Sequence, residues 1–399
     1  MSKTNWKNAL YNIMSINLIN FNITLAIFTM EWIISKLTCS SLLTGILIGL
    51  SSLAYFFSYF TGAFMDLTRK KKTILLGLII TLFTILFLSQ IALLANNDIF
   101  TIILLFYTFA ILTGFTSDIA RIILSIWIKE NVNEKDYRKV SSINRVTLRS
   151  LRILAEALAG LFLAISFKYS ITPSLIILVV VGFLLLSMNI TENVEEKRMH
   201  SFKKSLIDGF YYVKRSKVLT QFTILTTDNL FFEMQGLLLL FYVEDVLHQG
   251  PIYFSALLIS AEIGIVVGSI FALRINKGKL GFYQIIFRII ISASLASYVL
   301  INNIFLALIP TFLILFSSGV NSTLTSATLL RYIDKEYWGR TTGFIGVIAN
   351  GLSTLSGPLG GILIEIIGVG WTYVLVSVVM LIFTFLEYTF KEYYNLEIK

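Results

Sequence analysis

Long apolar runs separated by short polar connections are the main structural signal in this chain. Runs of roughly 18 or more apolar residues, enough to cross the ~30 Å hydrocarbon core of a bilayer as a helix, recur along its whole length. They do not alternate with a period of two, as the strands of a membrane barrel do. The pattern therefore predicts twelve membrane-spanning helices near 9–31, 41–61, 73–95, 99–127, 144–167, 171–190, 217–243, 252–272, 281–301, 303–328, 342–367 and 370–390.

Composition supports an integral membrane protein. Of the 399 residues, 56% are hydrophobic and only 14% are charged, and the mean hydropathy is +0.81. A soluble domain of this composition would lack the polar surface to cover itself. The single cysteine, Cys39, excludes an intramolecular disulfide and a cysteine metal site, and two histidines exclude a histidine cluster. We expect no metal and no cofactor, and we expect the first apolar run to be a retained helix.

The net charge of +9 has a topological interpretation. Most lysines and arginines fall in alternate connections, whereas the connections on the opposite side hold only Lys36 and Lys168. By the positive-inside rule, this predicts a multi-pass protein of the plasma membrane with both termini in the cytoplasm. The expected partner of the excess charge is anionic lipid rather than nucleic acid.

The chain also divides into two related halves. The longest polar interruption, Thr191–Lys217, predicts an N-terminal half at 1–190, a cytoplasmic linker at 191–216 and a C-terminal half at 217–399. Within the linker, Phe202–Val213 has apolar residues at helical spacing, which predicts a helix on the membrane surface. Lys135-Asp-Tyr and Lys335-Glu-Tyr repeat at an offset of 200 residues. We expect two six-helix repeats related by an axis along the membrane normal.

The connection after the second apolar run carries the most specific motif. Gly62-Ala-Phe-Met-Asp-Leu-Thr-Arg-Lys-Lys-Lys72 resembles the loop 2–3 signature of the major facilitator superfamily, G-x-x-x-D-R/K-x-G-R/K-R/K-R/K. It departs at Leu67, where the signature is basic, and at Arg69, where it has glycine. The resemblance implies an all-α fold of twelve transmembrane helices in two six-helix halves, and we expect a monomer.

The same resemblance implies a conformational latch between this loop and the cytoplasmic end of helix eleven. A carboxylate near a helix N-terminus would be stabilised by the helix dipole. The alternative is that the cations only set the topology, which fits the three lysines better than the aspartate. The latch candidates are Gly62, Asp66, Arg69, Lys70, Lys71, Lys72, Gly339 and Arg340.

Polar residues gather in the first, fourth, seventh and tenth predicted helices, and lipid cannot satisfy them. In the family that the chain resembles, the first helix of each three-helix unit lines a central cavity. The alternative for each residue is an interhelical hydrogen bond worth under ~2 kcal/mol. The substrate-cavity candidates are Asn17, Asn20, Thr24, Asn229, Glu233, Asn321 and Thr325.

Charged residues at membrane depth predict two further kinds of site. An unpaired carboxylate there stays neutral until a cation or water arrives, as a proton carrier must; the alternative is a salt bridge. The proton-coupling candidates are Asp228, Glu262, Asp118 and Arg121. Four charged residues at helical spacing predict an inner ionic network that ties the N-terminal half together or closes a gate, with proton coupling or anion binding as the alternative. These are Arg145, Arg149, Arg152 and Glu156.

The eleventh predicted helix is rich in glycine. Residues without side chains permit close helix packing, and proline permits a bend. The residues expected to make this helix flexible are Gly351, Gly357, Pro358, Gly360 and Gly361.

We interpret the chain as a secondary active transporter working by alternating access. No phosphate-binding G-x-x-x-x-G-K-S/T pattern occurs, so ATP is not the expected energy source. The sequence around Gly339 and Arg340 resembles the drug and macrolide efflux branch, which implies export of small amphipathic or lipophilic compounds by proton antiport. Aromatic residues expected in the cavity fit such substrates: Phe21, Phe28, Phe231, Phe232 and Tyr242.

Two alternatives stay open, namely proton-coupled uptake of a small polar metabolite and a non-transporting sensor on the same fold. An enzyme is not expected, because two histidines and one cysteine supply neither a nucleophile–base pair nor a metal cluster at membrane depth.

Overall fold

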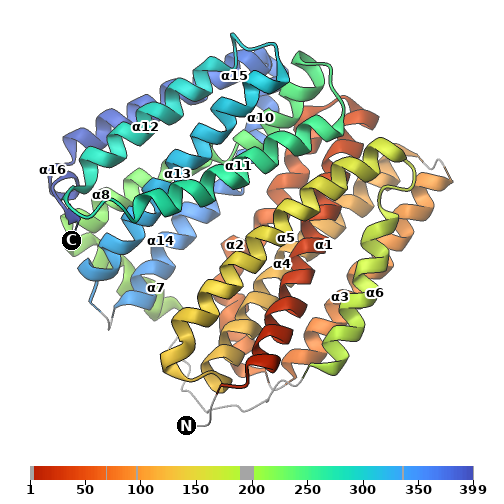
Figure 1. The fold of residues 1–399 in the computed structure, drawn as a ribbon, viewed down its shortest axis with the longest axis horizontal. Helices are drawn as coiled ribbons and strands as arrows, with labels where there is room; N and C mark the ends of the chain where they lie inside the picture. Colours follow the sequence, from red (N-terminus) through yellow and green to blue (C-terminus); the bar gives the residue numbers. More distant parts are fainter. Residues whose placement is uncertain (1–3, 69, 96–97, 189–201, 335–336, 399) are drawn as a thin grey trace. The chain divides into compact units, whose positions relative to one another are not determined.

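The computed structural model describes residues 4–68, 70–95, 98–188, 202–334 and 337–398, and helices dominate it (Figure 1). The described residues of the predicted N-terminal half form six long helices and one short 3-10 turn. They are α1 (Trp6–Thr38), α2 (Ser41–Leu67), α3 (Lys71–Leu94), α4 (Ile99–Asn131), η1 (Glu134–Asp136), α5 (Tyr137–Ile165) and α6 (Thr172–Ser187). Each of the six long helices overlaps one of the predicted apolar runs.

The remainder of the chain begins with α7 (Phe202–Arg215), the helix predicted in the linker. The further elements are α8 (Lys217–Leu225), η2 (Thr226–Asp228), α9 (Asn229–Phe232), α10 (Gln235–Phe241), η3 (Tyr242–Val246), α11 (Pro251–Ala272), β1 (Gly278–Lys279), α12 (Leu280–Ser297), α13 (Ile304–Tyr332), α14 (Trp338–Ser353), α15 (Ser356–Thr389), α16 (Lys391–Tyr394) and β2 (Glu397–Ile398).

The seventh predicted helix is interrupted rather than continuous. Elements α8 to η3 follow one another over Lys217–Val246, with a 3-10 turn at Thr226–Asp228 and a π-helical turn at its end. The hydroxyls of Thr226 and Thr227 donate to the carbonyls of Thr223 (2.8 Å) and Ile224 (2.7 Å). Threonine hydroxyls that bond the preceding turn compete with the regular ladder and bend helices. The break places Asp228 at an irregular turn.

The eleventh and twelfth predicted helices are divided differently from the expected ranges. The eleventh comprises α14 and the start of α15, with a break at Thr354–Leu355. Within α15, Gly368 has φ of 79° and ψ of 164°, which separates the eleventh crossing from the twelfth. Glycine adopts positive φ without the steric cost that a Cβ brings.

Two compact units emerge from the packing of the chain. Unit 1 comprises Met1–Cys39 and Leu50–Met199, and unit 2 comprises Ser40–Gly49 and His200–Lys399. In unit 1, α1 packs against α4, α5 and α6, and α3 packs against α4 and α6. In unit 2, α12 packs against α13 and α15, and α11 packs against α13 (Figure 1). The start of α2 thus belongs to unit 2, whereas the division at 190 and 217 stays a prediction.

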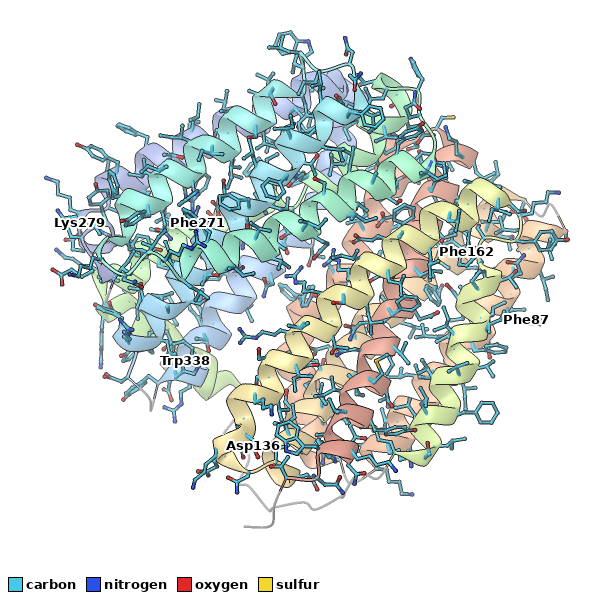
Figure 2. The ribbon with its side chains drawn as sticks, viewed as in Figure 1. Phe87, Asp136, Phe162, Phe271, Lys279 and Trp338 are labelled. Carbon is cyan, nitrogen blue, oxygen red and sulfur yellow. The ribbon has the colours of Figure 1, made fainter. Side chains whose placement is uncertain are left out.

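Apolar side chains cover much of the outside of the helices. Among the described residues, eight helices or helical stretches are long and apolar enough to cross a membrane, and Ser41–Phe57 and Thr172–Ser187 are shorter apolar helices. One of the eight, Trp338–Thr389, contains two predicted crossings. Helix α5 is not among the eight and carries the charged stripe predicted above. Large exposed side chains include Phe87 on α3 (47%), which Figure 2 labels. Phe305 (72%) and Trp371 (70%) are exposed as well. Such surfaces suit a lipid environment.

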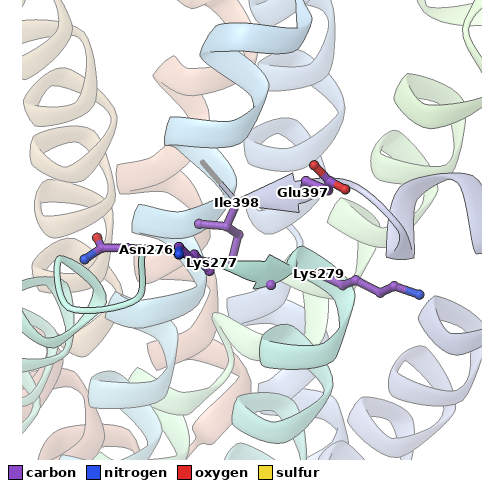
Figure 3. A pocket seen from close by; sticks show the side chains of 6 residues that line it. Asn276, Lys277, Lys279, Glu397 and Ile398 are labelled. Carbon is purple, nitrogen blue, oxygen red and sulfur yellow. The ribbon is translucent and has the colours of Figure 1, made fainter.

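The C-terminal residues close one end of unit 2. Strands β1 and β2 pair antiparallel, with Gly278 opposite Ile398 and Lys279 opposite Glu397. A shallow depression of about 470 Å³ lies beside this pair (Figure 3). Helix α16 packs on α8, α12 and α15. The last residues of the chain therefore pack against the ends of three membrane helices.

Candidate functional site

Amide side chains of α1 contact its neighbours in unit 1. Asn17 is buried, and its Nδ2 donates to Oδ1 of Asn144 on α5 (2.9 Å). Asn20 is partly exposed, and its Oδ1 accepts from Ser117 Oγ on α4 (2.7 Å). Thr24 lies one turn further along α1 and is half-buried. The predicted polar stripe therefore lies at the contact of α1 with α4 and α5. Asn17 and Asn20 hydrogen-bond to neighbouring helices there, so they contribute to helix packing.

The pair on α4 is an ion pair, as its spacing allows. Arg121 contacts Asp118 through Nη2 and Oδ1. The Asp118 side chain is 1% exposed, whereas that of Arg121 is 62% exposed. The carboxylate is thus buried and the guanidinium reaches the surface of unit 1.

The charged stripe of α5 holds one such pair as well. Arg152 Nε lies 3.2 Å from Glu156 Oε1, with side-chain exposures of 51% and 3%. Glu31 of α1 interacts electrostatically with both residues. Arg145 is exposed and Arg149 is half-buried on the same helix. The inner network of unit 1 therefore includes Glu31, which the spacing on α5 alone does not reveal.

Unit 2 contains a more deeply buried charge cluster. Arg288 of α12 contacts Asp228 Oδ2 through Nη1, and its Nε lies 2.9 Å from Glu387 Oε2 of α15. The side-chain exposures are 14% for Arg288, 11% for Asp228 and 0% for Glu387. We name these three residues the buried triad. Asp228 is a predicted proton-coupling residue, and the structure gives it the salt bridge that was its alternative.

Glu387 is a functional candidate that the sequence analysis missed. It is the single acidic residue in the predicted helix 370–390, which is otherwise almost purely apolar. A carboxylate in an apolar membrane helix needs a partner within the protein. An isolated acidic residue in such a run is therefore the sequence feature that could have identified Glu387.

A hydrogen-bonded layer lies beside the triad, toward the C-terminal tail. Gln284 Nε2 donates to the hydroxyls of Thr325 (2.5 Å) and Tyr393 (3.0 Å). Tyr393 is 1% exposed and stacks on Phe222 with ring centroids 5.7 Å apart, and its backbone N–H donates to Gln221 Oε1 (2.9 Å). The layer connects α8, α12, α13 and α16 around the triad.

The other cavity and coupling candidates of unit 2 are distributed along its helices. Asn321 of α13 is half-buried, and its Oδ1 has no hydrogen-bond partner among the described residues. Asn229 is half-buried, Glu233 is exposed, and Glu262 of α11 is 7% exposed.

The aromatic residues expected to line the cavity divide into two groups. Phe21, Phe28 and Tyr242 are buried at 6%, 3% and 1% exposure. Tyr242 donates its hydroxyl to the carbonyl of Ile301 (2.5 Å) and packs against two further buried tyrosines, so it belongs to the core of unit 2. Phe231 and Phe232 on α9 stay partly exposed.

The latch candidates lie at helix ends. Gly62 and Asp66 lie in the last turns of α2, and Arg69 lies outside the described residues, as do the side-chain contacts of Asp66. Lys71 Nζ donates to the carbonyl of Thr68 (2.9 Å). Lys72 Nζ donates to the carbonyls of Leu186 (2.7 Å) and Met188 (2.8 Å) at the end of α6, where a cation is favourable. These two cations thus cap helix ends within unit 1, and Lys70 is exposed.

At the start of α14, Arg340 pairs with α7. Its Nη1 lies 3.3 Å from Asp208 Oδ2. A Cβ on Gly209 would lie 2.4 Å from the carbonyl oxygen of Arg340, so the two helices touch at backbone distance. Tyr212 stacks on Tyr337. The predicted surface helix is therefore packed against α14, next to Trp338 (Figure 2), whereas a Cβ on Gly339 would meet open space.

Glycines bring α2 and α15 into close contact within unit 2. A Cβ on Gly357 would lie 2.2 Å from the Gly45 carbonyl oxygen, and one on Gly361 would lie 2.5 Å from that of Ser41. A Cβ on Gly49 would lie 2.9 Å from the ring of Pro358. Small residues four apart on both helices permit this approach. We name the contact of Ser41–Gly49 with Gly357–Gly361 the glycine seam.

Two side-chain contacts flank the glycine seam. Ser40 Oγ donates to Glu365 Oε1 (2.7 Å), and the Leu42 amide donates to the same oxygen (3.1 Å), so Glu365 caps α2. Of the residues expected to make helix eleven flexible, Gly360 faces Met234, and Gly351 lies three residues before the break between α14 and α15.

Together, long apolar helices, apolar outer surfaces and buried charge pairs are typical of a polytopic helical membrane protein. The family model of the Major Facilitator Superfamily matches residues 10–358. The chain belongs to this superfamily, and it is a transporter with the twelve-helix fold of two six-helix halves. Among curated proteins, no sequence match to the chain was found.

Solved transporters share the fold at low sequence identity. A mutant form of the nucleoside transporter NupG aligns with a TM-score of 0.74 and 13% identity, over 96% of this chain and 99% of that chain. The inward-open xylose transporter XylE from E. coli aligns at 0.72 and 11%, over 96% of each chain. A D-xylose-proton symporter aligns at 0.71 and 12%, over 96% and 97%.

Proposed function

We propose that this transporter takes up a small polar solute together with protons. The observation that carries the proposal is the amide and hydroxyl lining of the helices expected to face the solute. In unit 1, Asn20 and Ser117 form a partly exposed hydrogen-bonded pair, and in unit 2 Asn321 is half-buried, with a buried amide oxygen that has no hydrogen-bond partner among the described residues. Groups of this kind recognise hydroxyl and amide groups of a solute.

The aromatic residues that were predicted to line the cavity give only weak support to a lipophilic substrate. Phe21, Phe28 and Tyr242 are buried, so they are not available to line a cavity in this conformation. Nucleoside and xylose transporters, two of them with the fold over 96% of this chain, carry polar solutes by their names. This likeness supports the choice of solute class without defining the solute.

Export of amphipathic compounds by proton antiport is the second candidate. It rests on the resemblance around Arg340 to efflux transporters and on Phe231 and Phe232, which remain partly exposed beside Asp228. Under both proposals, the basic connections face the cytoplasm, because the positive-inside rule holds for either direction of transport.

Proton movement in proteoliposomes separates the two candidates. The purified protein is reconstituted around a pH-sensitive dye, and nucleosides, pentoses, peptides and lipophilic cations are added outside without an imposed gradient. Symport acidifies the lumen when a solute enters, whereas antiport makes the lumen alkaline. A polar solute that acidifies the lumen supports our proposal, and alkalinisation by lipophilic compounds alone overturns it.

The matched variants are Asp228→Asn and Asp98→Asn. Asp98 caps α4 by accepting from the Thr101 amide (3.1 Å), and asparagine caps helices equally well, so Asp98→Asn should transport normally. Asp228→Asn should abolish the proton signal.

A further inference from the structure

The buried triad holds more negative than positive charge when all its groups are ionised. Arg288 brings one positive charge, whereas Asp228 and Glu387 bring two negative charges. All three side chains are at most 14% exposed. An uncompensated charge in such a place is strongly disfavoured, and a buried carboxyl group becomes neutral by binding a proton.

The two carboxyl groups are not equivalent. Asp228 lies on an irregular turn, contacts Arg288 and keeps 11% of its side chain exposed. Glu387 is fully buried, and its Oε1 has no hydrogen-bond partner among the described residues. An ionised carboxylate is satisfied by several donors, so Glu387 is the less well stabilised of the two as an anion.

The surroundings of the triad supply no second positive charge within the part of the chain that the structure describes. Arg288 interacts electrostatically with Asp228, Glu387 and Tyr393, and Glu387 interacts with Arg288 and Asp228. Tyr393 is the additional titratable group, and Gln284 is neutral. Lys217 of α8 pairs with Glu392 of α16 at the surface, with side-chain exposures of 82% and 44%.

We propose that Asp228 and Glu387 share one exchangeable proton, with Arg288 as the common counter-ion, and that Glu387 holds it in the conformation seen here. Strongly coupled carboxyl groups titrate as a pair, so the proton belongs to the triad rather than to one residue. The inference deepens the proposed proton coupling by naming its site, but proton binding itself does not depend on which solute is carried. Release of the proton from Glu387 then requires Arg288 to pair more closely with Glu387, or water to reach Glu387.

Infrared difference spectroscopy of the purified full-length protein tests the proposal directly. The carbonyl stretch of a protonated carboxylic acid is separate from that of a carboxylate, and other buried acids cancel in a difference between variants. At neutral pH, wild type minus Glu387→Gln should show one carboxylic acid band. Wild type minus Asp228→Asn should show a band as well, because removal of either acid lets Arg288 neutralise the other.

Matched and opposite variants complete the test. Glu392→Gln removes a surface carboxylate five residues from Glu387 and should leave the band unchanged. Arg288→Gln should increase the band, since both acids then need protons. If neither carboxyl variant loses a band, the proposal is wrong. If Asp228→Asn keeps the band that Glu387→Gln loses, the proton is not shared.

Transport provides a second readout that a merely structural role would not change. In Glu387→Gln, uptake driven by a proton gradient should be lost, while exchange of labelled for unlabelled solute across the membrane should persist. Loss of both with normal folding overturns a coupling role. Absence of transport for every polar solute together with an intact band refutes the proposed function and leaves the proton site standing.

Discussion

The glycine seam between α2 and α15 gives the sharpest test of how this protein changes conformation. Helix α2 belongs to unit 2 over Ser41–Gly49 and to unit 1 from Leu50 onward. Movement of one unit against the other must therefore bend α2 or separate it from α15. The seam is close enough that one added methyl group changes its energy.

The magnitude follows from the geometry at Gly45. In Gly45→Ala, the new Cβ would lie 2.1 Å from the carbonyl oxygen of Gly357, whereas ordinary contact begins at 3.4 Å. The two backbones must separate by about 1.3 Å, the difference of these distances. Overpacking of this kind costs about 1–3 kcal/mol. A free energy of that size shifts a two-state equilibrium by about 5–150-fold toward the state with an open seam.

A buried thiol in the seam reports the shift. Ser41 is 2% exposed and donates to the Gly361 carbonyl (2.8 Å). In a Cys39→Ser background, which removes the only native cysteine, Ser41→Cys places one thiol in the seam. Its alkylation by a membrane-impermeant maleimide should accelerate in Gly45→Ala in proportion to the open fraction.

The control is a glycine without close neighbours. A Cβ on Gly182 of α6 would meet nothing within 4 Å, so Gly182→Ala should leave the alkylation rate unchanged. An unchanged rate in Gly45→Ala, with normal expression, would show that the seam does not open in the membrane. An equal acceleration in Gly182→Ala would show that the probe reports general loosening.

Three further changes test other contacts. Arg288→Gln removes the counter-charge of the buried triad and should lower the free energy of unfolding by about 3–5 kcal/mol, measured by thermal unfolding in detergent; a change below 1 kcal/mol contradicts a buried ion cluster. Gly209→Ala brings a Cβ within 2.4 Å of the Arg340 carbonyl and should release α7, seen as faster tryptic cleavage there. A hydrogen bond from Gln221 lowers the pKa of Glu392 below its ordinary 4.5, so this contact stabilises the tail above that pH and is lost as the pH falls through the lowered value. Hydrogen exchange in α16 should therefore rise on acidification in wild type, and Glu392→Gln should remove this pH dependence.

The positions of the helices could be predicted from the sequence because apolar length alone decides whether a segment crosses a bilayer. The interruption at Thr226–Asp228 could not, since it depends on hydroxyls bonding the preceding turn rather than on apolar periodicity. The positive φ of Gly368 marks the boundary between the last two crossings, which hydropathy places only approximately.

Contacts between residues far apart in the sequence limited how much of the candidate site could be predicted. The charge of Asp228 within an apolar run identified it as a candidate. Its partner Arg288 lies 60 residues away on α12, and such a pair cannot be recognised from a single sequence. Gly357 was recognisable as a packing residue, whereas its counterpart Gly45 lies in an apolar run without an obvious motif. Glu387 lies among uncharged residues in the sequence, so it was not recognised as a candidate. Its importance follows from its contact with Arg288 in the fold.

Each unit contains an arginine that interacts with two carboxyl groups, but the exposed fraction of the arginine side chain differs between the two clusters. In unit 1, Arg152 pairs with Glu156 and acts on Glu31, and its side chain is 51% exposed. In unit 2, Arg288 is 14% exposed behind the tail that carries Tyr393. A guanidinium that reaches solvent can exchange its carboxylate for a solute, since both contacts are made in a high effective dielectric. A buried guanidinium cannot, so the charge of its cluster changes through a proton. We therefore propose that the cluster in unit 1 is suited to solute contact and the cluster in unit 2 to proton binding.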